Sequence, residues 1–293
     1  MLIFFLFNSE RINKNMNDYE FRSWLKSPSR TLIMGILNLT PDSFSDGGQF
    51  NSIQKALDHT MEMIEAGADI IDIGGESSRP GSKPISFNEE IQRTVPVIEE
   101  IRKITDCAIS IDSYKSEVVE AALNVNANIV NDISGLTFDN EMAKIISNKK
   151  VPLIIMHMKG KPLDMQQNPI YDNLIKEICN FFSNQILQAN SAGIDSSKII
   201  LDPGIGFGKT LEDNFEIIRE LKQIRAMGFP VLIGPSRKSF IGDTLKLPTD
   251  DRIEGTMATI TAGLINGANI VRVHDIKETL RTVSIAEKII GFS

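Results

Sequence analysis

Three polar side chains that could hold a flat heterocycle each stand directly after a short apolar run. They are Asp112, Asn131 and Asp202. A carboxylate accepts two parallel N–H bonds from the amidine-like edge of a 2-amino-pyrimidinone, and an amide both donates and accepts. Lys238 can donate to the carbonyl or to a ring nitrogen of the same heterocycle. Each acid or amide alone could instead cap the helix after it, but together with the lysine they favour one binding site.

A second set of residues could bind an anionic leaving group. Alternation along a strand would place Arg272 and His274 on the same face. Ser78 and Arg79 are adjacent in a loop, and an arginine fork beside a hydroxyl matches phosphate oxygens. The chain has three histidines, and their positions form no cluster with metal-ligand spacing, which argues against zinc.

The glycine-rich segment 202–210 ends like a phosphate-binding loop but does not match one. Pro203 stands where such a loop needs its first glycine, and Lys209 stands at the third glycine position of the dinucleotide fingerprint. The glycines instead predict a tight turn past a flat ligand, with Phe207 against its ring.

These residues are positioned by eight short aliphatic runs that alternate with helical patterns. Such runs are typical of strands buried on both faces of a parallel sheet. They predict a single (β/α)₈ TIM barrel, an α/β fold with its active site at the C-terminal ends of the strands. The runs are Leu32–Leu37, Ile70–Ile73, Ala108–Ile111, Ile129–Val130, Leu153–Met156, Ile199–Leu201, Val231–Ile233 and Ile270–Val273. The helical patterns are Ile53–Ala66, Glu89–Ile104, Val118–Leu123, Asn173–Ala192 and Asn214–Met227, with Gly193 and Gly228 as expected left-handed caps.

Two of the predicted connections after strands are unusually long. They span Asn38–Asn51 and Gly74–Phe87, whereas such connections usually have about two to six residues. Long loops at this end of a barrel usually act as lids or substrate clamps, with surface decoration as the alternative. Phe44 is the large apolar side chain of the first loop that could cover a ligand.

One barrel domain over residues 31–293 is expected, preceded by a short N-terminal extension over residues 1–30. Within the extension, Met1–Phe7 is too short for a membrane span and lacks the flanks of a signal peptide, and Met16 is an alternative start. Asp18–Lys26 is expected to pack as a short helix across the bottom of the barrel. Its contacts would come from Tyr19, Phe21, Trp24 and Leu25.

The net charge and the cysteine content limit which binding partners and which cellular compartment the protein is expected to have. A net charge of −7 argues against a nucleic-acid-binding surface, which would need a basic patch. Cys107 and Cys179 are far apart and not in a metal-type spacing, which predicts two unlinked thiols in a reducing cytoplasm. The expected partners are therefore small molecules, with no nucleic acid and no membrane.

Taken in chain order, these motifs resemble those of the dihydropteroate synthases, a family of folate biosynthesis. The segment Met34–Gly48 is similar to the first signature of that family. The other matching landmarks are Gly74–Gly81, Ser110–Asp112, Asn131-Asp132, Asp202–Lys209, Ser236–Ser239 and Arg272–Asp275. The resemblance runs from about Leu32 to the C-terminus.

The resemblance implies a transferase that acts on a pterin. It would join 6-hydroxymethyl-7,8-dihydropterin diphosphate to 4-aminobenzoate, giving 7,8-dihydropteroate and pyrophosphate with Mg²⁺, and would be a cytoplasmic homodimer inhibited by sulfonamides. Asn38 would help bind the metal ion and the diphosphate. The catalytic residues implied are Asn38, Asp46, Arg79 and Lys238. The substrate-binding residues implied are Ser78, Asp112, Asn131, Met156, Asp202, Phe207, Lys238, Arg272 and His274, with Phe44, Pro80 and Ser239 in the 4-aminobenzoate pocket.

One position departs from the family pattern, and two rival interpretations share part of it. Ser78 stands where the family usually has threonine, so the hydroxyl is kept and a methyl group is lost. A pterin-binding methyltransferase that serves a corrinoid protein shares the pterin pocket but needs no diphosphate-binding residues. An inactive pterin-binding homologue would be expected to have lost loop residues. Both long loops, Arg272 and His274 are present, which favours the synthase.

Overall fold

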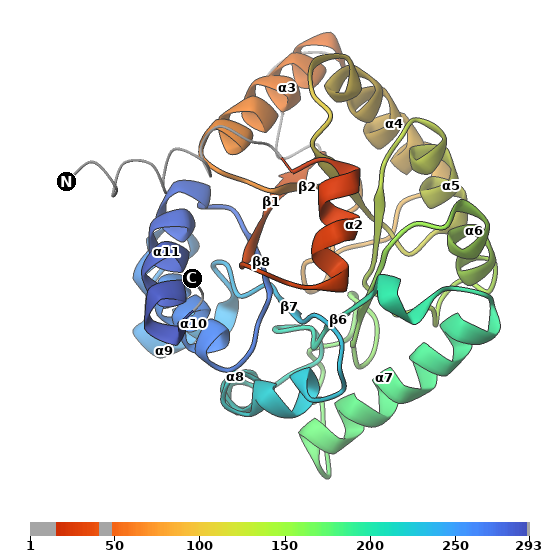
Figure 1. The fold of residues 1–293 in the computed structure, drawn as a ribbon. Helices are drawn as coiled ribbons and strands as arrows, with labels where there is room; N and C mark the ends of the chain where they lie inside the picture. Colours follow the sequence, from red (N-terminus) through yellow and green to blue (C-terminus); the bar gives the residue numbers. More distant parts are fainter. Residues whose placement is uncertain (1–15, 41–48, 292–293) are drawn as a thin grey trace.

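The computed structural model describes residues 16–40 and 49–291, which form a barrel of eight parallel strands surrounded by helices (Figure 1). The strands are β1 (Leu32–Asn38), β2 (Ile70–Gly74), β3 (Ala108–Asp112), β4 (Ile129–Asp132), β5 (Leu153–Met156), β6 (Ile199–Asp202), β7 (Leu232–Ile233) and β8 (Ile270–Val273). The predicted (β/α)₈ barrel is confirmed, and the predicted runs coincide with these strands to within one or two residues.

The barrel closes between β6 and β7. Hydrogen-bonded neighbours follow the order β6-β5-β4-β3-β2-β1-β8-β7. Among the described residues, β6 and β7 are joined by the isolated bridge Leu201↔Val231 and a 2.9 Å hydrogen bond from Leu201 N to Pro230 O. The predicted strand Val231–Ile233 was one residue too long, because β7 begins at Leu232 and Val231 forms the isolated bridge to Leu201 of β6.

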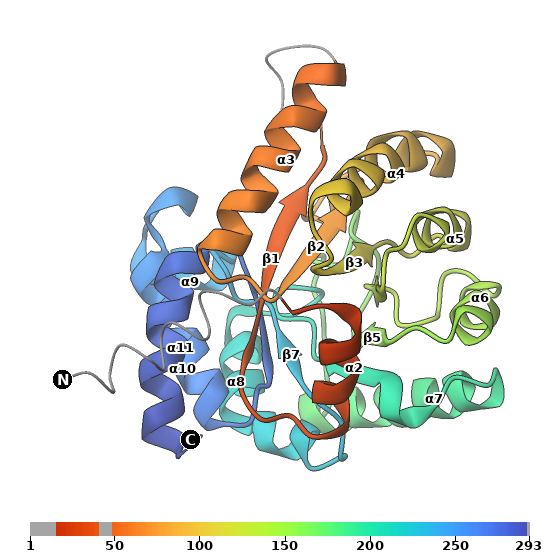
Figure 2. The ribbon, with the colours of Figure 1, turned by 45° about the horizontal axis from the view of Figure 1, so that its top comes forward.

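Helices alternate with the strands and form the outer ring (Figures 1 and 2). They are α3 (Gln49–Glu65), α4 (Phe87–Ile104), α5 (Ser116–Asn124), α6 (Met142–Lys149), α7 (Leu174–Ser191), α8 (Leu211–Arg225), α9 (Ser239–Leu245), α10 (Ile253–Ile265) and α11 (Ile276–Ile290), with short 3₁₀ helices at Ser196–Lys198 and Thr249–Asp251. The five predicted helices are confirmed with shifted ends. The predicted start of α8 was three residues late, because a capping box at Thr210 begins it at Leu211. Gly193 and Gly228 have φ of 93° and 94°, as expected for left-handed caps.

Helix α2 (Asp18–Lys26) covers the bottom of the barrel (Figure 1). Asn17 caps it, and its buried Phe21 and Trp24 pack in one cluster with side chains that line the barrel interior, such as Leu32. The expected packing is confirmed for three of the four apolar residues. Tyr19 is the exception, with 80% of its surface exposed, because it lies on the solvent side of the helix.

The two long loops differ in how much of them the structure describes. The loop after β1 is described up to Thr40 and again from residue 49, so the predicted roles of Phe44 and Asp46 fall outside the described residues. The loop after β2, residues 75–86, is described throughout. In the described part of the chain, no helix combines the length and the apolar character needed to cross a membrane.

Candidate active site

The mouth of the barrel contains a buried cation between two carboxylates. Arg272 on β8 donates from Nε to Asp72 Oδ2 and from an Nη to Asp112 Oδ2, at 2.6 Å each. Asp72 is fully buried, and a buried charge is stable only when it is paired. Although burial opposes it, the two carboxylates raise the pKa of Arg272, and burial raises the pKa of Asp112. The three strand ends are therefore tied together electrostatically.

Two oxygens beside this ion pair have no partner among the described residues. Asn131 on β4 donates its amide to Asp72 Oδ2 at 3.2 Å, which fixes the orientation of the amide. Its oxygen, Asn131 Oδ1, and the second oxygen of Asp72 are both buried without a hydrogen bond. Buried polar atoms normally have a partner, so these acceptors fit a ligand or an ordered water at the mouth of the barrel.

Asp202 lies on the other side of the mouth, at the end of β6. One of its oxygens accepts a 2.8 Å hydrogen bond from Gly204 N, and the side chain is buried. Burial raises the pKa of Asp202 to about 6. Capping does not explain these polar residues, because the N-caps of α5, α6 and α8 are Lys115, Glu141 and Thr210.

Lys238 and Phe207 form the next part of the wall. Lys238 Nζ lies 4.1 Å from the centre of the Phe207 ring, in a cation–π arrangement. Burial and, to a smaller extent, the charge of Arg272 lower the pKa of Lys238 to about 8. Phe207 packs in a small apolar cluster with Met156 and Ile133. A flat ring between Phe207 and the acids would therefore meet apolar surface on one side and polar groups at its edge.

His274 presents a neutral imidazole near Arg272. Ser236 Oγ accepts a 3.2 Å hydrogen bond from His274 N and lies 3.0 Å from His274 Nδ1, so its own proton can go to Nδ1. His274 is exposed at the end of β8, but desolvation of its ring by the surrounding protein, together with the charge of Arg272, lowers its pKa to about 4. When Ser236 donates to Nδ1, the proton of the neutral ring is on Nε2, which can donate to an anion. The expected pairing of Arg272 and His274 at one end of the site agrees with this geometry, although carboxylates already hold Arg272.

The remaining predicted residues lie around the rim. Asn38 is half-buried at the end of β1, and Ser78 is half-buried in the loop 75–86. Arg79 and Pro80 are exposed at the tip of that loop, and Ser239 is exposed at the start of α9. The structure thus brings the predicted strand-end residues together and leaves the predicted loop residues at the edge.

Two residues of the site region were missed from the sequence. Asp72 was overlooked inside the run Ile70–Ile73, although a carboxylate within a strand buried on both faces already signals a buried partner. Lys209 was treated as part of a false phosphate loop. Its ammonium is buried and contacts three carbonyl oxygens, those of His157, Gly204 and Phe207, at 2.9–3.3 Å. It also lies 3.0 Å from His157 Nδ1.

Replacing Lys209 by methionine should lower the free energy of unfolding by about 2–4 kcal/mol, because the carbonyls would lose their donor inside the protein. Urea denaturation measures this loss. The exposed Lys222 provides the control, since Lys222→Met should change stability by no more than about 0.5 kcal/mol. Equal stability of the two variants would mean that Lys209 does not hold the loop that carries Asp202 and Phe207.

Comparison with known proteins identifies the family to which this site belongs. The family model of pterin binding enzymes matches residues 34–274. A dihydropteroate synthase from Synechocystis is 48% identical over 88% of this chain and 90% of its own. The chain belongs to the dihydropteroate synthase family. It is therefore a transferase of folate biosynthesis that acts on small-molecule substrates.

Solved structures of the family have the same fold. A Yersinia pestis dihydropteroate synthase in complex with a sulfonamide drug has a TM-score of 0.85 and 41% identity, covering 89% of this chain and 94% of that one. A Xanthomonas albilineans dihydropteroate synthase in complex with 7,8-dihydropteroate has a TM-score of 0.80 and 35% identity, covering 89% of this chain and 94% of that one. The dihydropteroate synthase motifs identified in the sequence are therefore set in the barrel of that family.

Proposed function

We propose that the barrel mouth binds 6-hydroxymethyl-7,8-dihydropterin diphosphate and transfers its methylene carbon to the amine of 4-aminobenzoate, releasing pyrophosphate. The main support is the set of buried polar groups described above, which matches the edge of a pterin ring. Asp202 and Asp112 would accept N–H groups of the ring, Asn131 would both donate and accept, and Lys238 would donate to its carbonyl or a ring nitrogen. The free oxygen of Asn131 supports this assignment.

The diphosphate would lie at the rim, near the strand ends that carry cations. His274 would donate from Nε2, and Arg272 would add positive charge once the ligand is bound. Ser78 and Arg79 would reach the phosphates from the loop 75–86. Neutralising the negative charge that develops on the leaving pyrophosphate is the main catalytic contribution that we assign to these residues.

Mg²⁺ is the metal ion that the reaction would use. The amide oxygen of Asn38 is the kind of ligand that Mg²⁺ takes, and this ion usually keeps several waters and binds substrate phosphates. No group of three or more His, Cys, Asp or Glu side chains that could hold a metal lies among the described residues. An ion held by Asn38, the diphosphate and water fits these residues better than one in a protein cage. When bound, it would stabilise negative charge on the leaving group.

The reaction needs no acid–base pair in the protein. The bond between the methylene carbon and the diphosphate oxygen breaks, and the electron-rich dihydropterin stabilises the positive charge left on that carbon. The arylamine nitrogen then adds to the carbon and passes its proton to the released pyrophosphate. Water would capture the same cation, so the two long loops are needed to exclude it. Phe44 of the first loop, with Pro80 and Ser239, would complete the 4-aminobenzoate pocket, and Asp46 of the same loop would take a catalytic role.

Pyrophosphate release should depend on both organic substrates. With the pterin diphosphate and Mg²⁺ present, release measured by a coupled assay should begin only when 4-aminobenzoate is added, because the arylamine must trap the activated carbon. A chelator such as EDTA should suppress the release, and excess Mg²⁺ should restore it. Full turnover in the presence of the chelator would contradict the metal proposal, and methyl transfer to a corrinoid without pyrophosphate release would contradict the assigned reaction.

We also propose how the protein assembles, how the chain divides into domains and in which compartment it works. Exposed isoleucines on α10 and α11 support a homodimer, and sedimentation would measure it; they are Ile265, Ile285 and Ile289. Residues 31–293 are taken as the catalytic domain, to which α2 adds a bottom cover. The two free cysteines support a reducing cytoplasm.

A further inference from the structure

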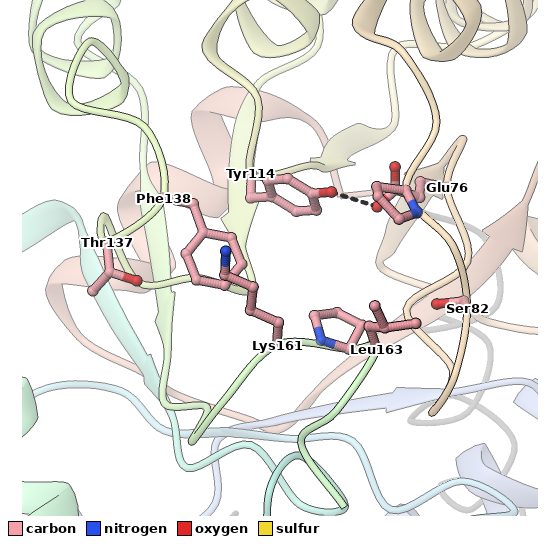
Figure 3. Close-up of a pocket in the computed structure, with 9 residues that line it drawn as sticks. Glu76, Ser82, Tyr114, Thr137, Phe138, Lys161 and Leu163 are labelled. Atoms are coloured by element: carbon pink, nitrogen blue, oxygen red, sulfur yellow. Dashed lines mark hydrogen bonds between the residues drawn. The ribbon is translucent and has the colours of Figure 1, made fainter.

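A cavity of about 690 Å³ lies beside the proposed active site, between loops that follow β2, β3, β4 and β5 (Figure 3). Cavities that bind small molecules typically have volumes of about 300–1,000 Å³. Its walls are Glu76, Ser82, Pro84, Tyr114, Thr137, Phe138, Lys161, Pro162 and Leu163. None of these residues belongs to the pterin or diphosphate groups assigned above.

The walls suit a flat aromatic ring. Tyr114 and Phe138 meet edge to face, with ring centres 5.4 Å apart and an angle of 79° between their planes. Pro84, Pro162 and Leu163 supply further apolar surface. Phe138 and Leu163 are also partly open to solvent, with 37% and 57% of their surfaces exposed. A ring that entered between them would bury this apolar surface and gain aromatic contacts.

The charges of the cavity select an anionic group at one end. Glu76 has its own partners, because Tyr114 donates to one of its oxygens at 2.6 Å and Lys115 Nζ lies 2.6 Å from the other, although Lys115 also pairs with the buried Glu90. Lys161 Nζ lies 5.7 Å from the centre of the Phe138 ring, and no carboxylate of the described residues pairs with it. Figure 3 shows Lys161 and Phe138 together on the side of the cavity away from Glu76. Within the described part of the chain, the Lys161 end of the cavity therefore carries an unpaired positive charge, whereas the carboxylates lie at the Glu76 end.

The cavity also depends on the position of the loop 75–86. Gly81 N donates to Pro162 O at 2.9 Å, which holds this loop against the loop after β5. Ser82 and Pro84 of the same loop line the cavity, whereas Ser78 and Arg79 are the residues proposed to act on the diphosphate. A ligand in the cavity would contact Ser82 and Pro84 and so stabilise the docked position of the loop.

We propose that this cavity is a second ligand site that takes an aryl carboxylate. The ring lies between Tyr114, Phe138 and Leu163, and the carboxylate faces Lys161. An occupied site keeps the loop 75–86 docked on Pro162. The inference goes beyond the proposed function, because binding at this site does not require turnover.

The test uses 2-naphthoate, an aryl carboxylate without the amine that a substrate would need. Calorimetry should detect binding to the full chain, and Lys161→Met should weaken it about tenfold through the lost charge-assisted contact. Phe138→Leu should also weaken it, as the aromatic edge is lost. The matched control Lys222→Met, which removes an exposed lysine on α8, should bind as the wild type does. Thermal unfolding would check that the variants fold.

Hydrogen exchange measures the effect on the loop. Saturating 2-naphthoate should slow exchange of the Gly81 amide in the wild type, and Lys161→Met should abolish that protection at the same concentration. Absence of binding, or equal affinity in the wild type and both cavity variants, would overturn the proposal. Binding without any change at Gly81 would overturn the part that concerns the loop. These outcomes do not depend on whether the chain makes dihydropteroate.

Discussion

Replacing Asp202 by asparagine should weaken the binding of a pterin by about two orders of magnitude, or about 3 kcal/mol. The carboxylate would lose its charge, and the amide that replaces it can direct N–H groups toward the N–H edge of the ligand. The substituted amide would keep one acceptor oxygen for Gly204 N, so the turn should survive. Calorimetry with a pterin that lacks the diphosphate measures the effect. The exposed Asp172 offers the control, since Asp172→Asn should leave the affinity unchanged.

The pH dependence of the same affinity provides an independent check. The pKa of Asp202 in the empty site is about 6, and the ligand binds the carboxylate form. Above that pH, the wild-type affinity should be nearly constant with respect to this group. Below it, binding must first remove a proton, so the affinity should fall by up to about tenfold per pH unit. Asp202→Asn should lose this slope, and an unchanged slope in the variant would assign the titration to another group.

The second large effect is expected at Arg272. Arg272→Met would leave Asp72 and Asp112 buried next to each other without their cation, and removal of one partner of a buried ion pair costs about 3–5 kcal/mol. Urea denaturation should show this loss. The loss should shrink at low pH, because burial already raises the pKa of Asp112 and protonation of this group removes one of the uncompensated charges.

A second substitution separates charge from packing. In the Arg272→Met background, Asp72→Asn removes one of the uncompensated charges and should recover part of the stability. Wild-type stability of Arg272→Met would show that water replaces the guanidinium. Failure of the double variant to recover anything would show that Arg272 contributes through packing alone.

The fold could be predicted because its pattern is local. Short aliphatic runs such as Ile199–Leu201, each followed by a polar residue, already specify strands buried on both faces and the end at which the site lies. The predicted ends of the helices were less accurate, because capping interactions determine where a helix begins and ends. The predicted run for β7 was too long by one residue for a similar reason. The ends of a strand depend on the residues with which it pairs, and the sequence does not show these partners.

The sequence predicted many residues of the candidate site, but not which of their side chains would pair with one another. Asp112, Asn131 and Asp202 were identified because each directly follows an aliphatic run and their side chains together match the edge of a heterocycle, and Lys238 because it follows the seventh run closely. The sequence could not show that Arg272 would pair with Asp72, which is 200 positions away. Lys209 was missed because its partners are backbone carbonyls, which leave no mark in the side-chain pattern.

The closing seam of the barrel has a consequence for how the empty and occupied protein should differ. Asp202 ends β6 and Lys238 follows β7, so a pterin held as proposed would span the two strands that are joined least by backbone hydrogen bonds. The ligand would therefore link β6 to β7 through its contacts with Asp202 and Lys238. The substrate then completes the barrel in part. Local opening of the empty barrel should be most frequent at β6 and β7, and a bound pterin should reduce it most at these two strands.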